Sequence, residues 1–377
     1  MNLSFWEKQT WFEKPEVVII GSGIVGLNAA LNLKKRKPGL KVLVLEKGFL
    51  PSGASTKNAG FACFGSVSEL VDDLSRHSEK EVFALVEKRF KGLKRLRKNL
   101  GDDAIDYKPY GGLEVFDDEK SFSDCADRVP YFNKLVGKIT GIKNVYRVAD
   151  KKIAASGMKG FTHLIHNTGE GQIDTGKMMQ ALTRKVQNMG VNILSGIGIT
   201  SFESDEKEVR LHTDKDLSFN AKRLLIATNG FAKRLLPGYP VVPARAQVLI
   251  TSPVKGLKLK GAFHYDKGFY YFRNIGDRVL LGGGRNLDFK TEETDEFGLT
   301  EKVQHKLEEL LRTRIIPYAN YSIEQRWSGI MGTGPQKSSI IKEVQANVFC
   351  AVRMGGMGVA IGSLVGEDAA LMVGRSL

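Results

Sequence analysis

The first fifty residues alternate between apolar runs and a segment with helical spacing. Val17 to Gly23 is strand-like, a helical pattern follows from Ile24 to about Lys35, and Lys41 to Glu46 forms a second apolar run. Apolar runs that flank such a helical segment are typical of a β-α-β unit. The pattern therefore predicts that the fold starts with a β-α-β unit.

The periodicity changes several times along the rest of the chain. Residues 241–286 alternate as antiparallel strands do. Helical spacing recurs at 67–100, 174–189, 299–315 and 359–373. We therefore expect an α/β fold, with a Rossmann-like domain on a parallel central sheet and a substrate domain of mostly antiparallel sheet. The predicted boundaries are 1–105, 155–235 and 325–377 for the first domain, and 106–154 and 236–324 for the second.

Charge and cysteine content narrow the class of protein. The chain has 377 residues and a net charge of +14, and it lacks the ~20 consecutive apolar residues of a membrane helix. Its N-terminus does not resemble a secretory signal, so we expect a cytoplasmic protein. The cysteines, Cys63, Cys125 and Cys350, are far apart, and the six histidines show no metal-ligand spacing. Neither a disulfide framework nor a metal site is expected.

Three glycines at the first strand-to-helix turn carry the clearest chemical signal. Gly21, Gly23 and Gly26 form G-x-G-x-x-G. Such glycines permit a tight turn, the approach of a pyrophosphate and close helix packing, and the helix N-terminus favours phosphate. Glu46, which ends the next strand about 20 residues later, would accept hydrogen bonds from a ribose diol. This order predicts dinucleotide binding but does not distinguish FAD from NAD.

Four motifs together resemble those of the D-amino-acid oxidase-like FAD-dependent oxidoreductases, which include glycine, sarcosine and γ-glutamylputrescine oxidases. They are VVIIGSGIVGLNAALNL with Glu46, GASTKNAG at 53–60, RLLIATNG at 223–230 and RMGGMGVAIG at 353–362. The resemblance covers essentially the whole chain and implies FAD as the cofactor. No residue matches those that carry a covalent flavin, so we expect non-covalent binding.

FAD is too long for one β-α-β unit to enclose. A glycine-rich loop near the C-terminus would let backbone and a helix N-terminus approach the flavin closely. From the fingerprint and the resemblance, the expected cofactor-binding residues are Gly21, Gly23, Ile24, Val25, Gly26, Glu46, Lys47, Gly53, Ala54, Ser55, Thr56, Asn58, Ala59, Gly60, Thr228, Asn229, Gly230, Gly355, Gly356, Met357, Gly358 and Val359.

The resemblance implies hydride removal from a carbon that bears nitrogen, followed by imine hydrolysis and flavin reoxidation, with oxygen as the expected acceptor. Amino-acid oxidases of this group hold the substrate carboxylate with an arginine in a W-x-G-L-R-P motif. Here RWSGIMGTGP places Met331 at that position. Methionine cannot make the bidentate contact, so either the substrate lacks an α-carboxylate or another arginine serves. The candidates are Arg326, Arg273, Arg245 and Arg353.

Aromatic residues complete the predicted substrate side. The strand GFYYFRN resembles the active-site strand of the amine-oxidising branch, and its alternation places Tyr271 and Arg273 on one face. Trp327 matches a tryptophan of the group, and Met331 and Met357 are expected to line an apolar cavity. The expected catalytic residues are Tyr271, Arg326, Trp327 and Met331.

These patterns favour an FAD-dependent oxidase or dehydrogenase of amines or amino acids, with a small-molecule substrate and no nucleic-acid partner. One alternative is a dehydrogenase of 2-hydroxy acids or polyol phosphates that reduces a quinone or an electron carrier, and another is a non-catalytic flavoprotein. The basic amphipathic helix expected at 82–100 either presents a solvated face or contacts a membrane surface or carrier.

Overall fold

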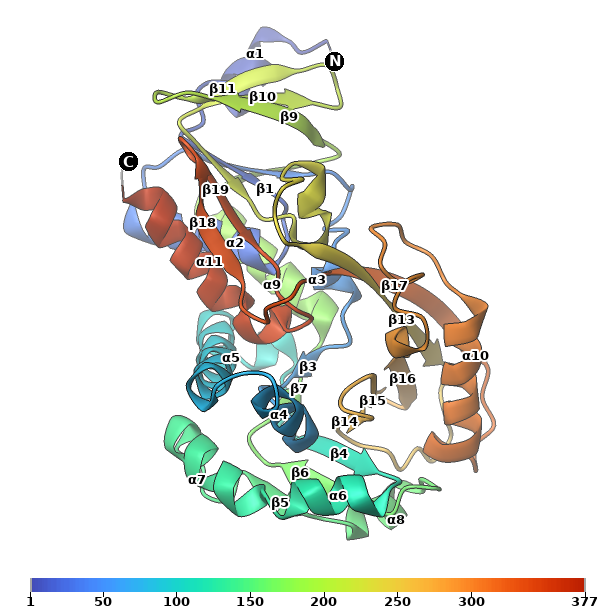
Figure 1. The fold of residues 1–377 in the computed structure, drawn as a ribbon. Coiled ribbons are helices and arrows are strands. Elements are labelled where there is room, and N and C mark those ends of the chain that lie inside the picture. Colours follow the sequence, from blue (N-terminus) through green and yellow to red (C-terminus); the bar gives the residue numbers. More distant parts are fainter. Residues whose placement is uncertain (1, 376–377) are drawn as a thin grey trace.

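Two large sheets organise the chain in the computed structural model, which describes residues 2–375 (Figure 1). The first sheet has the strand order β18-β19-β12-β1-β2-β8, and its strands are parallel except at the β18–β19 pair. Its strands are β1 (Val17–Ile20), β2 (Val42–Glu46), β8 (Asn192–Ser195), β12 (Arg223–Ile226), β18 (Ile340–Gln345) and β19 (Val348–Val352).

The second sheet has the order β17-β13-β16-β15-β14-β4-β6-β5, and its strands are antiparallel except at the β14–β4 pair. Its strands are β4 (Gly112–Phe116), β5 (Tyr146–Val148), β6 (His163–Asn167), β13 (Val242–Thr251), β14 (Ala262–Tyr265), β15 (Tyr270–Ile275), β16 (Arg278–Gly283) and β17 (Ile323–Thr333). The expected combination of a largely parallel sheet and a mostly antiparallel sheet is confirmed.

Two smaller sheets and a set of helices complete the fold. The small strands are β9 (Ile199–Ser204), β10 (Val209–Thr213) and β11 (Ser218–Ala221) in one sheet, and β3 (Phe61–Ala62) and β7 (Gly171–Gln172) in the other. The α-helices are α1 (Phe5–Glu7), α2 (Ile24–Arg36), α3 (Ala54–Lys57), α4 (Val67–Leu74), α5 (Glu79–Leu100), α6 (Glu119–Ala126), α7 (Val129–Thr140), α8 (Lys151–Ser156), α9 (Thr175–Asn188), α10 (Glu301–Leu310) and α11 (Gly358–Gly374). Short 3₁₀ helices include η3 (Asn229–Arg234) and η4 (Arg285–Leu287).

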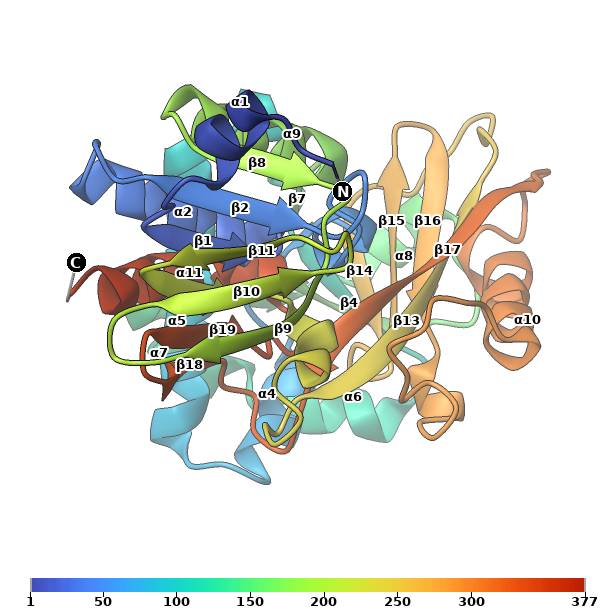
Figure 2. The same ribbon diagram turned by 90° about the horizontal axis from the view of Figure 1, so that it is seen from above.

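Both faces of β1 and β2 are buried within the six-stranded sheet, which explains why these two strands are continuous apolar runs. Val17 and Ile19 belong to the core that contains α2, α9 and α11. Val18 and Ile20 pack instead with residues of β10 and β11. Figure 2 shows the three-stranded sheet β9–β11 lying across the first sheet, on the side away from α2 and α11.

The last helix returns to the first one and so joins the two ends of the sequence. A Cβ built on Gly366 of α11 would lie 2.6 Å from Asn28 Cβ and 2.7 Å from Val25 O of α2, so glycine permits this close approach. Residues of α11 are buried around most of the helix, consistent with its apolar sequence. This packing brings the C-terminal glycine loop beside the N-terminal fingerprint.

The helical region expected at 67–100 consists of two helices, because α5 has its own start. Ser78 and Glu81 form a capping box, in which the Ser78 side chain accepts from Glu81 N and Glu81 accepts from Ser78 N.

The apolar stripe of α5 is buried, and the three arginines of this helix, Arg89, Arg95 and Arg97, form ion pairs. A contact of this helix with a membrane surface or carrier stays a prediction. No helix in the described part of the chain has both the length and the apolar character to cross a membrane.

Sheet membership differs from the predicted domain boundaries at two strands. Strand β6 lies between β4 and β5, and β17 pairs with β13 along most of its length, so both belong to the antiparallel sheet. The sequence-based boundaries assign 155–235 and 325–377 to the nucleotide domain. Local alternation does not reveal with which distant strand a segment pairs. The division into domains is otherwise still a prediction.

Candidate functional site

A large cavity lies between the two sheets, with a volume of about 1650 Å³. One wall comes from the fingerprint turn, the 53–60 loop and the C-terminal glycine loop, and the other from one face of the antiparallel sheet. Cavities for one drug-sized ligand typically measure roughly 300–1000 Å³. The volume therefore accommodates a dinucleotide together with a small substrate.

The fingerprint turn has the geometry that its glycines predict. Gly21 has φ of +103°, a conformation that side chains disfavour, and a Cβ on Gly26 would collide with Gly21 O. Helix α2 starts after Gly23, and Ser55 Oγ accepts a hydrogen bond of 2.9 Å from Ile24 N. A Cβ on Gly23 would lie 2.9 Å from the same hydroxyl. The turn thus offers the backbone N–H groups and space that a pyrophosphate requires.

Glu46 lies buried at the end of β2 and in the cavity wall. Its Oε2 accepts from Ser22 N at 3.1 Å and Ser22 Oγ at 2.9 Å. Its Oε1 accepts from Gly48 N at 3.0 Å and Ser52 Oγ at 3.1 Å. Each oxygen therefore has one fixed backbone donor and one hydroxyl donor, and a ribose hydroxyl can replace the latter. This environment fits a carboxylate that accepts from a ribose.

The C-terminal glycine loop lies between β19 and α11. Gly355 and Gly356 have φ of +57° and +80°, so the loop needs residues without Cβ. Met354 N donates to Asn229 Oδ1 at 3.1 Å, and Gly355 N donates to Gly332 O at 2.9 Å. These bonds hold the loop against the ends of β12 and β17. Met331 lies beside it, because its Sδ would be 3.3 Å from a Cβ on Gly356.

Most of the expected cofactor-binding residues line this one cavity. They are Gly21, Gly23, Ile24, Val25, Glu46, Lys47, Gly53, Ala54, Ser55, Asn58, Ala59, Thr228, Asn229, Gly355, Gly356, Met357, Gly358 and Val359. Four others, Gly26, Thr56, Gly60 and Gly230, are not lining residues. Gly26 and Gly230 permit close packing against Gly21 O and Met331 O, and Thr56 donates to Pro51 O. The residues that line the cavity are thus compatible with the FAD cofactor that the sequence predicts.

The substrate side is a row of register partners that crosses the antiparallel sheet. Trp327 is opposite Val248, Val248 is opposite Gly282, Gly282 is opposite Tyr271, and Tyr271 is opposite His264. Three of these side chains, on Val248, Tyr271 and His264, line the cavity, together with Met331. Trp327 lies between the sheet and the 53–60 loop, where its Nε1 donates to Lys57 O at 3.0 Å. Burial raises the pKa of Tyr271 to about 12.

Arg326 lies on the opposite face of the sheet, since neighbouring residues of a strand alternate. Its guanidinium donates to Gln304 Oε1 at 2.6 Å and to Glu308 Oε1 at 2.9 Å, both on α10. The structure therefore does not place Arg326 in the cavity.

The other candidate arginines also have structural partners. Arg273 donates to Gly60 O and Ile173 O, and Arg353 donates to Ser338 O and Pro240 O. Arg245 forms a buried ion pair of 2.8 Å with Glu292. Within residues 2–375, none of the four arginines considered from the sequence is a lining residue of the cavity.

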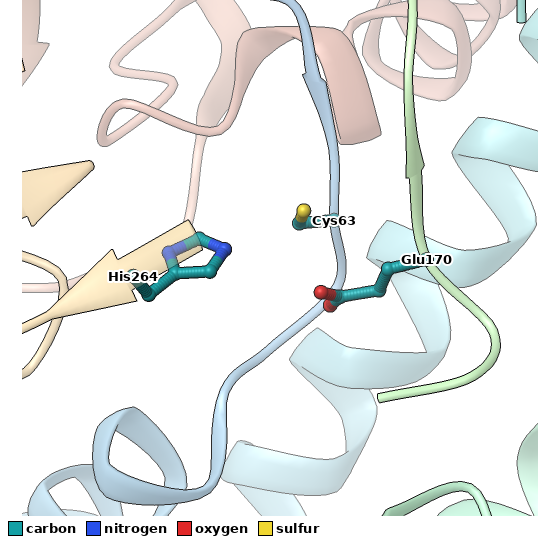
Figure 3. A group of neighbouring side chains, drawn as sticks. All are labelled: Cys63, Glu170 and His264. Carbon is teal, nitrogen blue, oxygen red and sulfur yellow. The ribbon is translucent and has the colours of Figure 1, made fainter. Parts of the chain in front are cut away.

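A group of polar side chains that sequence spacing does not reveal lies beside this row. Figure 3 shows His264 of β14 pointing toward Cys63 and Glu170, which come from two other segments. One donor atom of each residue lies within 4.8 Å of the others. Nitrogen, oxygen and sulfur donors of this kind can bind a metal such as zinc. Because the three residues are about 100 positions apart, no motif could have indicated the group.

Hydrogen bonds account for two members of this group without an ion. Glu170 Oε1 accepts from Phe64 N at 2.7 Å and Gly65 N at 2.9 Å, and Cys63 is a further hydrogen-bond partner of the carboxyl group. Burial raises the pKa of Glu170 to about 7 and that of the Cys63 thiol well above its ordinary value. Burial also lowers the pKa of His264 to about 4, and its Nε2 has no hydrogen-bond partner among the described residues. Near pH 7 the thiol and the imidazole are therefore uncharged.

Two known proteins are similar to this chain in sequence. The probable oxidoreductase OrdL of Rhizobium meliloti (strain 1021) is 25% identical over 379 residues, which cover 96% of this chain and 84% of the relative. Glycine oxidase of Geobacillus kaustophilus (strain HTA426) is 24% identical over 277 residues, or 71% of this chain and 69% of the relative.

Solved structures extend the likeness to the fold. L-proline dehydrogenase from P. horikoshii has a TM-score of 0.75 at 20% identity, with 97% of this chain and 94% of that one covered. Glycine oxidase from Geobacillus kaustophilus has a TM-score of 0.75 at 21% identity, with 96% and 94% covered. At these identities the structures show a shared fold. The family model described as FAD dependent oxidoreductase matches residues 16–372, and the chain therefore belongs to this family, which implies FAD as its cofactor.

Proposed function

We propose that this chain oxidises a C–N bond of an amine or amino acid, with non-covalently held FAD as the hydride acceptor. The observation that carries the proposal is one cavity in which the dinucleotide fingerprint meets the Tyr271–His264 face of the antiparallel sheet. Relatives of similar fold are named for oxidation of proline or glycine, which supports nitrogen-bearing substrates. Flavin, when bound, supplies the capacity to accept the hydride.

The chain's own residues would bind and orient the substrate. Tyr271, His264, Met331 and Val248 form a wall that carries no charge near pH 7, since the pKa of Tyr271 is about 12 and that of His264 about 4. A largely desolvated wall without charge favours the neutral form of an amine over its ammonium form. The unpartnered Nε2 of His264 can accept a hydrogen bond from the substrate N–H in the tautomer that leaves this nitrogen unprotonated.

Anaerobic bleaching of the flavin tests the substrate class. Purified holoprotein is mixed with amines, D- and L-amino acids, N-methyl amino acids and 2-hydroxy acids, and flavin absorbance is followed. We expect at least one amine or amino acid to bleach the flavin. Bleaching by 2-hydroxy acids alone would reject the proposal in favour of a hydroxy-acid dehydrogenase, and no bleaching by any compound would favour a non-catalytic flavoprotein.

Two further measurements address the cofactor and the acceptor. Denaturation should release all the flavin into the supernatant, because we propose that no covalent bond holds it. Turnover in air should produce hydrogen peroxide if oxygen is the acceptor. Turnover that needs an artificial acceptor and yields no peroxide would instead identify a dehydrogenase.

A further inference from the structure

Three side chains with different donor atoms meet at the cavity wall. Cys63, Glu170 and His264 offer one donor atom each, and these atoms lie within 4.8 Å of one another (Figure 3). We infer that this group binds a divalent metal ion of the zinc class. The inference departs from the expectation based on histidine spacing, which does not detect ligands that are distant in the sequence. The site is additional to the proposed oxidation of an amine, and its test does not require turnover.

The donor set matches the preferences of zinc. Zinc binds thiolate sulfur, imidazole nitrogen and carboxylate oxygen, whereas magnesium and calcium prefer oxygen alone. In a tetrahedral zinc site the ligand atoms lie roughly 3.3–3.8 Å apart, which follows from bonds of about 2.0–2.3 Å. From separations of at most 4.8 Å, the three atoms therefore need to approach one another by at most about 1.5 Å. Side-chain rotation can cover such a distance.

His264 supplies a nitrogen that no described protein group uses. Its Nε2 is buried and has no hydrogen-bond partner among residues 2–375. Figure 3 shows the outer nitrogen of this ring directed toward Cys63 and Glu170. A buried polar atom without a partner costs free energy, so it points to a ligand that satisfies it. Neutral imidazole is the form that binds metals, and burial keeps this ring neutral near pH 7 because it lowers the pKa to about 4.

The hydrogen bonds of Glu170 hold a ligand in place rather than substitute for the ion. Phe64 N and Gly65 N both donate to its Oε1, at 2.7 and 2.9 Å. Hydrogen-bond partners of this kind orient ligating carboxylates in metal sites. The carboxyl group is buried, so the chain fixes its position. The adjustment on metal binding therefore falls to Cys63 and His264.

The electrostatic surroundings of the group favour a cation. Beyond the effect of burial, the carboxylate of Glu69 acts to raise the pKa of Cys63, of Glu170 and of His264, so all three lie in its negative potential. Arg273 acts in the opposite sense on Cys63.

Bound metal changes the charge of the ligands. A metal ion deprotonates a coordinating thiol, and the pKa values given above describe the protein without the ion. With the ion, Cys63 and Glu170 contribute two negative charges, which balance a divalent cation. A buried site of zero net charge avoids the cost of an uncompensated charge.

The fourth position of a tetrahedral ion would face the cavity. Cys63 and His264 are lining residues of the large cavity, whereas Glu170 is not. Three protein ligands leave one position for a water molecule or for a group of a bound small molecule. The site is thus reached from the cavity, and added metal can enter it without unfolding of the chain.

Isothermal titration calorimetry of chelator-treated holoprotein with zinc chloride tests the site. Wild type should bind one ion per chain. Loss of a hydrogen-bond partner of a ligand costs about 10- to 100-fold in metal affinity, so Cys63→Ser and His264→Gln should each weaken binding by about 100-fold or more. Glu170→Gln should weaken it as well, since an amide oxygen carries no charge. Cys350→Ser and His163→Gln, at a buried thiol and an ion-paired imidazole outside the group, should change Kd by less than about twofold.

Cobalt provides a second readout that reports the ligands directly. Tetrahedral Co²⁺ bound through a thiolate absorbs at wavelengths longer than the bands of oxidised flavin, so its spectrum can be followed in the yellow protein. We expect these bands in wild type and their loss in Cys63→Ser at equal flavin content. Mg²⁺ should produce no binding heat, because it prefers oxygen ligands.

Two results would overturn the inference. The first is the absence of saturable zinc binding by wild type. The second is equal zinc affinity in wild type, Cys63→Ser and His264→Gln, which would place the ion at another group. Equal flavin content in all variants excludes loss of the fold as the cause of weaker binding. The bleaching experiment is read separately, so failure of the metal site and failure of the proposed function are distinguishable.

Discussion

The ring of Tyr271 occupies the space that a side chain at Gly282 would fill. The two residues are direct partners on β15 and β16. A Cβ built on Gly282 would lie 2.5–2.7 Å from Cε2, Cζ and the hydroxyl oxygen of Tyr271. The missing side chain at position 282 thus determines how a cavity-lining tyrosine is oriented.

Replacement of Gly282 by alanine should therefore move Tyr271 and impair turnover while FAD remains bound. A side chain displaced by about 1 Å can cost on the order of 100-fold in the rate of a reaction that depends on substrate position. The measurement is the anaerobic bleaching rate with the substrate found above, together with flavin content. Gly39→Ala is the matched control, because no described residue other than its chain neighbours has an atom within 4 Å of a Cβ built there. Identical bleaching rates in both variants would show that the tyrosine adapts without consequence.

A bulky residue at Gly23 should abolish FAD binding. Valine would press on the Ser55 hydroxyl, which lies 2.9 Å from the Cβ position, and would fill the space for the pyrophosphate. The expected product is a colourless protein whose circular dichroism matches that of the wild-type apoprotein. Gly238→Ala, with open space around its Cβ, should stay yellow. A fully yellow Gly23→Val protein would mean that the pyrophosphate binds elsewhere.

Local sequence predicts the fingerprint well because its physics is local. Gly21, Gly23 and Gly26 act within one turn, and β1 and β2 are apolar because both faces of these two strands are buried. Alternation correctly predicts that Tyr271 and Arg273 share a face, but it cannot tell whether that face meets the cavity or α10. Which face meets the cavity depends on the register between strands that are distant in the sequence. The ion pair of Arg326 with Glu308 depends on tertiary structure in the same way. So does the group formed by Cys63, Glu170 and His264.

Arg326 provides a test of this distinction between faces. Arg326→Met removes the contacts to Gln304 and Glu308 on α10, a partly exposed set. We expect the free energy of unfolding to fall by roughly 0–1 kcal/mol and the Kd for benzoate to be unchanged. Urea denaturation measures the free energy of unfolding, and the change in flavin absorbance during a titration with benzoate gives the Kd. A large increase in Kd would place Arg326 in the binding of the carboxylate, contrary to its position in the sheet.

Glu170 should make stability depend on pH in a direction opposite to that of most carboxylates. Burial raises its pKa from 4.5 to about 7, so the fold favours the protonated form. This contribution is fully present below pH 4.5 and is lost as the pH rises through 7. Among its neighbours, Cys63 has a pKa well above the ordinary value, His264 one of about 4 and Glu69 one of about 2, so these three keep their charge between pH 5.5 and 8.

The Glu170→Gln variant isolates this effect, because glutamine is neutral at every pH and keeps an oxygen acceptor for Phe64 N and Gly65 N. Between pH 5.5 and 8, wild type should lose roughly 2–3 kcal/mol of unfolding free energy relative to Glu170→Gln. Urea denaturation with saturating FAD at both pH values measures the difference. Glu206→Gln, at an exposed carboxylate, should show none. An equal difference in unfolding free energy between wild type and Glu170→Gln at both pH values would mean that the two backbone donors keep Glu170 ionised throughout, with a negative charge beside His264.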